Sequence, residues 1–348
     1  MQPTRPRLAS ICLPVRNEGR YLRECLESLV GQDYLPGGYE IVVADGGSAD
    51  ATREIVEEYA RRGPVRVRLV ENPDGGVAAG RNAALRAAEG EVIVFVEGHA
   101  WVGRDFLRTA VRLLEETGAL CLGRRVEQEI PGDTPFQRAT GRVRAGWLGR
   151  NPHSLRFGER QEGWVDPTTV ATVYRREVFE RFGLFDEAFT TNEDVEFNWR
   201  LAEAGVKAYQ SPALTYHLHP RDTWLGLAKQ MYRYGRGKAQ FVRKCPEAMR
   251  VGYALPSLAL ALGVGLATAS IWYRPAALAL VGAALAASIT PGGRPSLRAL
   301  AIRCGMVMGF GWGFAEGIAR PYRGRAVPAS VPPCNREGGE PRLARGED

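Results

Sequence analysis

Three short polar clusters follow apolar runs near the N-terminus, and the residue types of one of them suit the binding of a metal ion. The clusters are Arg16-Asn17-Glu18, Asp45-Gly46-Gly47-Ser48-Ala49-Asp50 and Glu97-Gly98-His99. If the preceding runs are parallel strands of one sheet, their carboxyl ends lie along the edge where open α/β sheets bind ligands. We therefore expect the clusters to converge on one cleft. Singly, each cluster is also typical of turns and helix caps, with Asn17 as a candidate N-cap.

Glu97 and His99 pair an oxygen donor with a nitrogen donor two residues apart. Side chains at i and i+2 of an extended chain point to the same side, so both donors can face one ion. This donor pair suits Mg²⁺ or Mn²⁺ when substrate phosphates supply further ligands. The competing interpretation is a loop histidine beside a solvated glutamate.

A second acidic cluster, Glu193-Asp194, precedes Phe197 and Leu201, which are spaced as on one face of a helix. The helix dipole favours negative charge at the N-terminus and would hold these acids in a fixed orientation. A carboxylate held in this way can act as a general base toward a nearby hydroxyl. Helix capping explains the same residues equally well.

Three familiar site motifs are missing from the sequence. There is no G-x-x-x-x-G-K-S/T, no G-x-G-x-x-G after the first apolar run, and no G-x-S-x-G. These absences exclude a P-loop and disfavour both a dinucleotide-binding fold and a hydrolase nucleophile elbow. The six cysteines are scattered without a C-x-x-C pair, which disfavours a zinc ribbon and a disulfide scaffold.

The polar clusters require a scaffold, and strand and helix patterns alternate from residue 8 to about 120. Apolar strand-like runs occur at 8–15, 41–44, 65–70 and 92–96, and helical patterns at 17–30, 50–60, 77–88 and 106–116. Repeated β–α units predict a parallel sheet with right-handed crossovers. Residues 121–220 are less regular, but no linker precedes them. We therefore assign residues 1–220 to one α/β domain with a mostly parallel, Rossmann-like sheet.

The last third of the chain has the composition of a membrane segment. Residues 251–273 contain no charge, residues 275–293 form a second uncharged run, and 299–319 is apolar apart from Arg303 and Glu316. About 20 apolar residues suffice to cross a bilayer. We therefore expect two to three transmembrane helices within 251–319. The tail at 320–348 is rich in Pro, Gly and Arg, which predicts disorder.

The net charge of +7 is concentrated directly before the first of these apolar runs. Residues 221–250 contain eight basic and two acidic residues, so this segment holds six of the seven charges. That distribution argues against a general nucleic-acid-binding surface. Apolar residues recur in this segment at helical spacing, which predicts a basic amphipathic helix at the membrane interface. Basic residues beside a span mark the cytoplasmic side, so we expect a multi-pass membrane protein with a cytoplasmic catalytic domain.

Together, these motifs resemble the inverting family 2 glycosyltransferases of the GT-A fold, over roughly residues 8–238. Within that family the chain looks most similar to membrane-bound exopolysaccharide transferases of the succinoglycan-biosynthesis type. The matching stretches are Leu13-Pro14-Val15-Arg16-Asn17-Glu18, Asp45 to Asp50, Ala79-Gly80-Arg81-Asn82, Glu97-Gly98-His99-Ala100, Tyr174 to Phe179, Asn192-Glu193-Asp194 and Tyr232-Arg233-Tyr234-Gly235-Arg236.

The resemblance implies a nucleotide-sugar site built largely from the first half of the chain. Pro14, Asn17 and Glu18 would line the nucleotide pocket. Asp45 would accept a hydrogen bond from the nucleotide base, and Arg81 would approach the ribose or the phosphates of the donor.

The resemblance also implies the reacting groups. Glu97 and His99 occupy the metal-binding motif of the family, which is usually Asp-x-Asp, so both acids are replaced here. Asp194 would be the catalytic base, with Glu193 beside it. His217, or else the nearby His219, would complete the metal shell.

The basic segment contains a further match, because Gln230-Met231-Tyr232-Arg233-Tyr234 resembles the Gln-x-x-Arg-Trp motif of processive synthases with Tyr in place of Trp. By that likeness Gln230 and Arg233 would contact the donor diphosphate, and Tyr234 the acceptor. We assign the other basic residues Arg243, Lys244 and Arg250 to the anionic leaflet.

The implied function is transfer of a sugar from a nucleoside-diphosphate sugar, with a UDP-sugar as the usual donor, to a lipid-linked or other membrane-presented glycan. A divalent metal, Mg²⁺ or Mn²⁺, would assist, and the product would belong to an exopolysaccharide or a cell-envelope glycan. The alternatives are a processive polysaccharide synthase and a non-catalytic nucleotide-sugar binder. The Tyr at the Trp position argues against the first, and the intact Glu193-Asp194 argues against the second.

Overall fold

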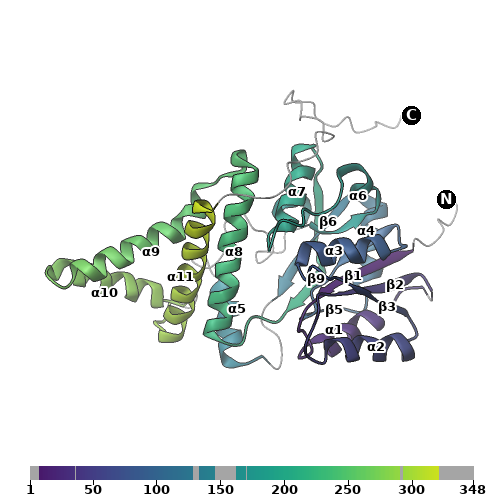
Figure 1. Ribbon diagram of the computed structural model, residues 1–348, viewed down its shortest axis with the longest axis horizontal. Coiled ribbons are helices and arrows are strands. Elements are labelled where there is room, and N and C mark those ends of the chain that lie inside the picture. Colours follow the sequence, from purple (N-terminus) through teal and green to yellow (C-terminus); the bar gives the residue numbers. More distant parts are fainter. Residues whose placement is uncertain are drawn as a thin grey trace.

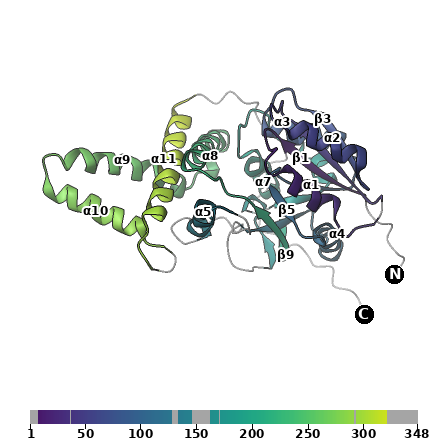
Figure 2. The same cartoon turned by 90° about the horizontal axis from the view of Figure 1, so that it is seen from below.

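The computed structural model describes residues 8–35, 37–127, 133–145, 162–169, 171–290 and 293–320 (Figure 1). An α/β domain is followed by C-terminal helices, two of which project away from it as a hairpin (Figures 1 and 2). The tail predicted to be disordered, residues 320–348, lies outside the described residues apart from Arg320.

The strands of the described residues join one sheet in the order β3-β2-β1-β4-β8-β6-β9-β5, with β7 paired to β9. Strands β1 to β4 are parallel, whereas β8 runs antiparallel between β4 and β6. The predicted Rossmann-like half is therefore confirmed, and the second half makes the sheet mixed. The strands are β1 (Ala9–Val15), β2 (Tyr39–Asp45), β3 (Arg66–Glu71), β4 (Val92–Phe95), β5 (Ala100–Val102), β6 (Cys121–Glu127), β7 (Gly163–Val165), β8 (Ala171–Arg175) and β9 (Ala208–Leu218).

Helices cover both faces of the sheet, which explains the continuous apolar runs of its inner strands. Ile11 and Leu13 pack with α1, α2 and α4 on one face, whereas the intervening Cys12 packs with α3, α6 and α7 on the other (Figure 1). Neighbouring strand residues point to opposite faces, so each face has its own core. The helices are α1 (Leu22–Val30), α2 (Thr52–Arg62), α3 (Val77–Ala87), α4 (Phe106–Thr117), α5 (Pro135–Ala145), α6 (Glu177–Phe182) and α7 (Glu193–Glu203).

The first helix starts later than the sequence suggested. It begins at Leu22 with Tyr21 at the N-cap position, so Asn17 is not its cap. Asn17 lies instead in the loop after β1, in a left-handed backbone conformation with φ of 54°. The spacing of the leucines correctly predicted a helix, but the polar residues before that helix belong to the loop after β1.

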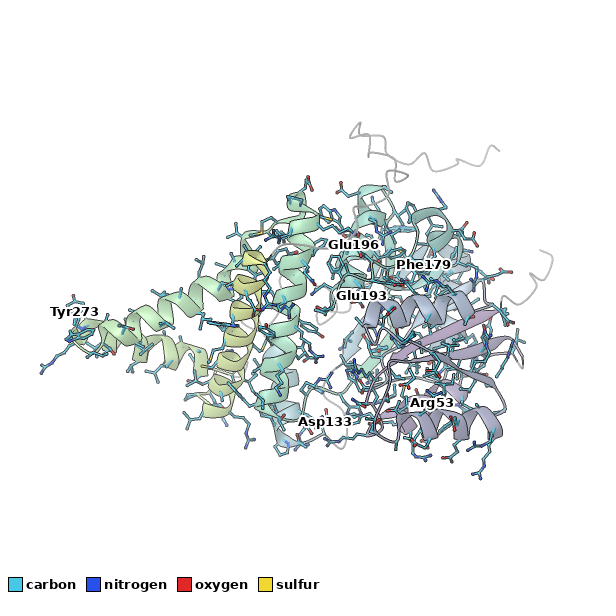
Figure 3. The ribbon with its side chains drawn as sticks, viewed as in Figure 1. Arg53, Asp133, Phe179, Glu193, Glu196 and Tyr273 are labelled. Carbon is cyan, nitrogen blue, oxygen red and sulfur yellow. The ribbon has the colours of Figure 1, made fainter. Side chains whose placement is uncertain are left out.

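The C-terminal segment forms α8 (Trp224–Lys244), α9 (Val251–Ala269), α10 (Arg274–Ser288) and α11 (Leu297–Ala319). Helices α9 and α10 form the projecting hairpin, and Tyr273 lies at its tip (Figure 3). Large apolar side chains such as Leu262 of α9 and Leu278 of α10 are exposed. Within the described ranges, only α9 is both long and apolar enough to cross a membrane, and α10 is a shorter apolar helix. By this criterion of length and hydropathy, one transmembrane helix is supported among the described residues, where two or three were expected.

Helices α8 and α11 lie side by side along their length (Figures 1 and 2). Glycines allow this approach: a Cβ at Gly309 would lie 2.4 Å from the carbonyl oxygen of Ala228, and one at Gly313 would lie 2.1 Å from that of Tyr232. Small residues at such positions let helix backbones pack closely. Helix α8 is thereby joined to the helix that follows the hairpin.

Two of the three charged residues of α11 also serve helix packing. Arg303 donates hydrogen bonds of 2.6 Å to the carbonyl oxygens of Ala287 and Ile289, at the C-terminal end of α10. Such carbonyls have no partner within their own helix and are stabilised by a cation. Glu316 accepts a hydrogen bond from the Tyr232 hydroxyl of α8.

We predict that Gly313→Ala will destabilise the contact between α8 and α11. The added methyl would overlap the Tyr232 carbonyl, and overpacking of this kind typically costs about 1–3 kcal/mol. Thermal unfolding in detergent should therefore show a lower Tm for Gly313→Ala than for the matched Gly263→Ala, whose new Cβ has no atom within 4 Å. Equal Tm values for the two variants would contradict the prediction.

Candidate active site

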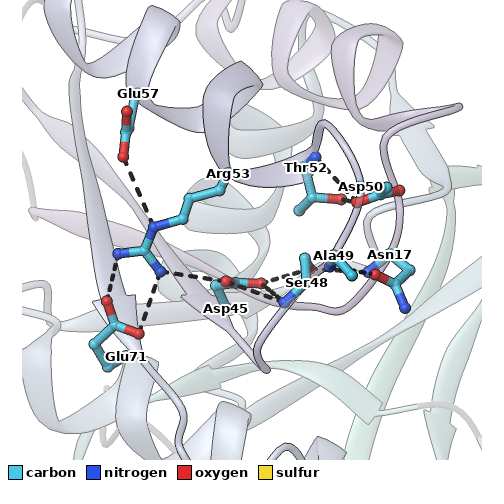
Figure 4. Close-up of polar contacts among 9 residues, drawn as sticks. All are labelled: Asn17, Asp45, Ser48, Ala49, Asp50, Thr52, Arg53, Glu57 and Glu71. Atoms are coloured by element: carbon cyan, nitrogen blue, oxygen red, sulfur yellow. Dashed lines mark hydrogen bonds and ion pairs between the residues drawn. The ribbon is translucent and has the colours of Figure 1, made fainter.

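Asn17 holds together the loops that follow β1 and β2 (Figure 4). Its backbone N–H donates to Ser48 Oγ at 2.9 Å, and its side-chain Oδ1 accepts from the Ala49 N–H at 2.8 Å. Asparagine tolerates the left-handed backbone of this position better than most residues. The first two polar clusters therefore meet at the carboxyl end of the sheet, as the sequence predicted. Pro14 lies nearby in β1, paired with Ala44 of β2.

Asp45 ends β2 with a buried carboxylate in a fixed orientation. The residue is 1% exposed and accepts hydrogen bonds from Ser48 Oγ at 2.6 Å and Ser48 N at 3.1 Å. Arg53 lies 3.4 Å from the same carboxylate and 2.5 Å from Glu71 (Figure 4). A buried carboxylate requires such compensation. The turn thus fixes the position of Asp45, and its role toward a nucleotide base stays a prediction.

His99 is oriented by Glu18, which brings the third polar cluster to the first. Nδ1 of His99 lies 3.0 Å from Glu18 Oε1, and the Glu18 N–H donates to Thr52 Oγ1 at 2.8 Å. When Nδ1 carries the proton, it donates to Glu18 and leaves the Nε2 lone pair as an acceptor. Metal-binding histidines are commonly oriented by a carboxylate in this way. Glu18 is therefore placed as the partner of His99.

Glu97 is held by two groups of the second half of the sheet. Its backbone N–H donates to the Tyr216 hydroxyl at 2.8 Å, and its carboxylate lies 3.3 Å from the buried guanidinium of Arg124. Arg124 stacks over the Tyr216 ring at 3.4 Å, and the pairing of β6 with β9 shifts register at this residue. Bulges near active sites re-aim side chains. The sequence reasoning missed Arg124, although an arginine pair directly after the short apolar run Cys121-Leu122-Gly123 was a visible signal.

Glu97 and His99 suit a divalent metal as two donors among several. In the part of the chain that the structure describes, no group of three or more His, Cys, Asp or Glu side chains could hold a metal ion. Mg²⁺ is commonly bound by one or two protein carboxylates together with substrate phosphates and water. The carboxylate of Glu97 and the oriented imidazole of His99 therefore fit a metal that the donor diphosphate also binds.

His217 is directed away from these donors. It follows Tyr216 in β9, and because Tyr216 faces Glu97, strand alternation turns His217 to the opposite face. There it stacks on Trp101 with ring centroids 3.7 Å apart and lies 3.6 Å from Glu127. Burial lowers the pKa of His217. This arrangement does not support the predicted place of His217 in the metal shell.

His219 is also engaged elsewhere. Its two ring nitrogens each lie 2.8 Å from a carboxylate oxygen, one of Asp133 and one of Glu24. Its ring also stacks on Tyr21. The contacts join α1 to the segment that leads into α8, which is a structural role.

Arg81 does not line an open pocket but forms a buried ion pair with Glu193. Its Nε lies 3.0 Å from Glu193 Oε1, and both side chains are under 10% exposed. The guanidinium also contacts the rings of Phe95 and Phe185, 5.0 and 5.4 Å from their centroids. The direct approach of Arg81 to ribose or phosphate that the resemblance implies is therefore replaced by a contact between α3 and α7.

The two acids at the start of α7 lie in different surroundings. Glu193 is buried, and burial raises its pKa to about 7 against the lowering effect of Arg81. Asp194 is partly exposed and accepts a hydrogen bond from the Val195 N–H at 2.8 Å. Arg81 interacts electrostatically with Glu193, Asp194 and Glu97, so the acids of α7 and of the third polar cluster share one region. Paired acids in unlike surroundings are typical of separate acid–base roles.

Gln230 and Arg233 of α8 differ in their exposure to solvent. Gln230 is 8% exposed, its Nε2 lies 3.4 Å from the Tyr234 hydroxyl, and its Oε1 has no hydrogen-bond partner among the described residues. Arg233 is exposed. The predicted contact of both residues with a diphosphate stays a prediction, and the buried amide oxygen of Gln230 is the stronger sign of an additional partner.

Lys244 is not available to the anionic leaflet, contrary to the sequence-based assignment. Its ammonium group is buried, 2.5 Å from Asp186 and 3.0 Å from Glu196 of α7. Arg243 is exposed but donates to the carbonyl oxygen of Ile318 in α11. These charges therefore stabilise the packing of α8 between its neighbours.

The mixed sheet, with polar clusters where its parallel strands end, defines a fold of the GT-A type. The family model described as "Glycosyl transferase family 2" matches residues 10–183. The chain belongs to glycosyl transferase family 2, and it is a glycosyltransferase.

Sequence relatives agree with this assignment. The succinoglycan biosynthesis protein ExoA of Rhizobium meliloti (strain 1021) is 30% identical over 232 residues, which cover 66% of this chain and 68% of that protein. A second relative, from Methanococcus voltae, is 25% identical over 243 residues, which cover 68% of this chain and 74% of that protein. Its name is "Dolichyl N-acetyl-alpha-D-glucosaminyl phosphate 3-beta-D-2,3-diacetamido-2,3-dideoxy-beta-D-glucuronosyltransferase".

A solved structure shares the fold. The mannosyltransferase PcManGT from Pyrobaculum calidifontis, in complex with GDP-Man and Mn²⁺, has a TM-score of 0.65 at 22% identity. The alignment covers 91% of this chain and 88% of that one. At this identity the likeness supports the fold.

We predict that the protonation of Glu193 makes stability depend on pH. The folded-state pKa of about 7 lies above the ordinary value of 4.5, so the folded protein holds this proton more tightly than the unfolded chain. The stabilisation is fully present below pH 4.5 and is lost as the pH rises to about 7. Urea unfolding of the wild type and of Glu193→Gln at several pH values should show this loss in the wild type only. Parallel pH profiles would contradict the prediction.

Proposed function

We propose that the protein is an inverting glycosyltransferase that moves a sugar from a nucleoside-diphosphate sugar, with UDP as the expected nucleotide, to a hydroxyl of a lipid-linked glycan. The observation that carries this proposal is the start of α7, where Glu193 pairs with Arg81 of α3 and the partly exposed Asp194 follows it. It places a partly exposed carboxylate in the same region as the donors expected to face the diphosphate. The membership of this chain in glycosyl transferase family 2 supports sugar transfer as the class of reaction.

Different residues of the chain would bind the nucleotide, hold the metal and accept the proton. Asp45 and the loop at Asn17 would bind the nucleotide, while Glu97 and His99 would hold a divalent metal. When bound, that metal neutralises charge on the diphosphate leaving group. Asp194 takes the proton of the acceptor hydroxyl as its oxygen bonds to the anomeric carbon. The bond from that carbon to the diphosphate oxygen breaks on the opposite face, which inverts the configuration and releases the nucleoside diphosphate.

Asp194 is better suited to this role than Glu193. Glu193 is buried against Arg81, and its raised pKa keeps a large share of it protonated near neutral pH. Asp194 is partly exposed beside it, so a hydroxyl can reach its carboxylate. Glu193 would then orient the start of α7, and Asp194 would accept the proton.

We predict that Asp194→Asn abolishes turnover but retains donor binding. An amide cannot take the acceptor proton, and loss of a positioned general base typically costs about 10²–10⁴-fold. A thermal-shift screen of nucleotide sugars with Mg²⁺ and Mn²⁺ would identify the donor, since a ligand of the native state raises Tm. Release of nucleoside diphosphate from that donor should then fall in Asp194→Asn and not in the control Glu180→Gln, an exposed acid on α6.

Two outcomes would argue against the proposed function. A wild type that neither transfers sugar nor hydrolyses any donor, with either metal, would favour a nucleotide-sugar binder. Long polymers formed on a single acceptor would favour a processive synthase.

The membrane context is part of the proposal. The apolar α9–α10 hairpin projects from the domain with its large side chains exposed, which is unfavourable in water. Residues Trp272 and Tyr273 at its tip are of the kind enriched at membrane interfaces. The names of the Rhizobium and Methanococcus relatives refer to succinoglycan synthesis and to a dolichyl phosphate acceptor. Together these observations support a protein anchored in the membrane by α9 that acts on a lipid-linked acceptor. A second span and a cytoplasmic catalytic domain are further parts of the proposal, and they rest on the uncharged run 275–293 and on the basic residues of 221–250.

We predict that Leu262→Lys weakens membrane integration. Leu262 lies within α9 and is 63% exposed, and a lysine at the centre of a span costs about 2.5–3.5 kcal/mol. Carbonate extraction of membranes should release more of this variant than of the wild type. The control Leu35→Lys alters a leucine of the α/β domain that is 48% exposed, and its extraction should not change. Equal release of both variants would contradict the hairpin as the anchor.

A further inference from the structure

We propose that α8, the basic helix beside the membrane segment, positions the catalytic base through a backbone contact at Gly237. This inference rests on the proposed role of Asp194. It makes Gly237 and Asn192 positioning residues, since neither supplies a reacting group. The contact lies at the turn Thr191-Asn192, directly before the helix that carries Asp194.

The turn before α7 has an unusual backbone. Asn192 is one of two non-glycine residues with positive φ among those described, with φ of 65° and ψ of 20°. Left-handed conformations are less costly for asparagine than for most residues, but they still require support. The Asn192 Nδ2 donates to the carbonyl oxygen of Tyr234 in α8 at 3.2 Å, and its own carbonyl accepts from the Glu196 N–H at 3.0 Å. One side of this turn is thus fixed by α8 and the other by α7.

Gly237 allows α8 to lie against this turn. A Cβ at this position would be 2.4 Å from the carbonyl oxygen of Thr191 and 2.6 Å from Asn192 Nδ2. The first of these is a backbone atom, so a rotamer change cannot relieve the overlap. Either α8 or the turn has to move.

Helix α8 is prevented from moving away. On its other side, a Cβ at Gly235 would lie 2.2 Å from the carbonyl oxygen of Phe310, so α8 is already packed tightly on α11. Toward α7, Phe241 packs edge-on against Trp199 with centroids 5.9 Å apart, and Lys244 lies 3.0 Å from Glu196. With α8 and the body of α7 both fixed, extra volume at position 237 displaces the turn.

The displacement would reach Asp194 but not the donor site. Asp194 follows Asn192 by two residues, whereas Asp45 ends β2 and Asn17 lies in the loop after β1. A shift of about 1 Å in a catalytic group can lower the rate about 10²-fold. The expected signature is a lower kcat with unchanged affinity for the nucleotide. A general loss of structure would lower both.

The test compares Gly237→Ala with Gly263→Ala in full-length protein in detergent. Both changes add one methyl to a helix, but the new Cβ at 263 has no atom within 4 Å. We expect kcat for nucleoside-diphosphate release to fall about 10²-fold in Gly237→Ala only. The Kd for UDP with Mn²⁺, measured by calorimetry, should stay within twofold of the wild type in both variants. An unchanged kcat in Gly237→Ala, or a parallel loss of UDP binding, would overturn the proposal.

If Gly237→Ala does not fold, a second variant, Asn192→Gly, tests the same proposal. Asn192→Gly keeps the positive φ without strain and removes only the side-chain hydrogen bond to α8. It should lower kcat while UDP binding is retained, and a wild-type kcat would overturn the proposal. A wild type without turnover would instead overturn the proposed function, on which this inference depends.

Discussion

The buried ion pair between Arg81 and Glu193 is the interaction on which the candidate site depends. Burying two charges is costly, and close geometry with additional contacts is needed to offset the loss of hydration. Here the pair has a 3.0 Å contact, and the guanidinium also lies against the rings of Phe95 and Phe185. Because Arg81 lies on α3 and Glu193 opens α7, this pair fixes the start of α7 to the parallel half of the sheet. The position of Asp194 follows from it.

A second constraint acts on α7 from the opposite direction. Helix α8 contacts the turn before α7 at Gly237 and packs on α11 through Gly235 and the glycines of α11. Helix α7 is therefore held between the rest of the α/β domain and α8, which packs on the helix that follows the α9–α10 hairpin. The basic stretch that dominates the charge of the chain is partly internal to this assembly, because Lys244 is buried against Asp186 and Glu196. From the number of charges alone, Lys244 would be expected to contact the anionic lipid leaflet.

Local patterns predicted what depends on local geometry. The apolar runs predicted the strands of the parallel half of the sheet. The polar residues after these runs predicted that the segments at Asn17 and Asp45 meet, because parallel strands end at one edge of a sheet. The partners of Arg81, Arg124 and Lys244 were not predictable in this way, since each lies far along the chain and is set by tertiary packing. The direction of His217 depends on the register of β9, which places Tyr216 toward Glu97. A spacing rule cannot supply that register.

The replacement of the usual Asp-x-Asp by Glu97-Gly98-His99 is consistent with the geometry around it. A glutamate is longer than an aspartate, and its carboxylate meets Arg124 at 3.3 Å. The histidine is oriented by Glu18, so a carboxylate is still present beside the second position, one residue further from the metal. A Cβ at Gly98 would lie 3.0 Å from Glu18 Cγ, so the residue between the two donors has to be small for this arrangement to form. The motif therefore keeps an acidic character, distributed over two loops instead of one.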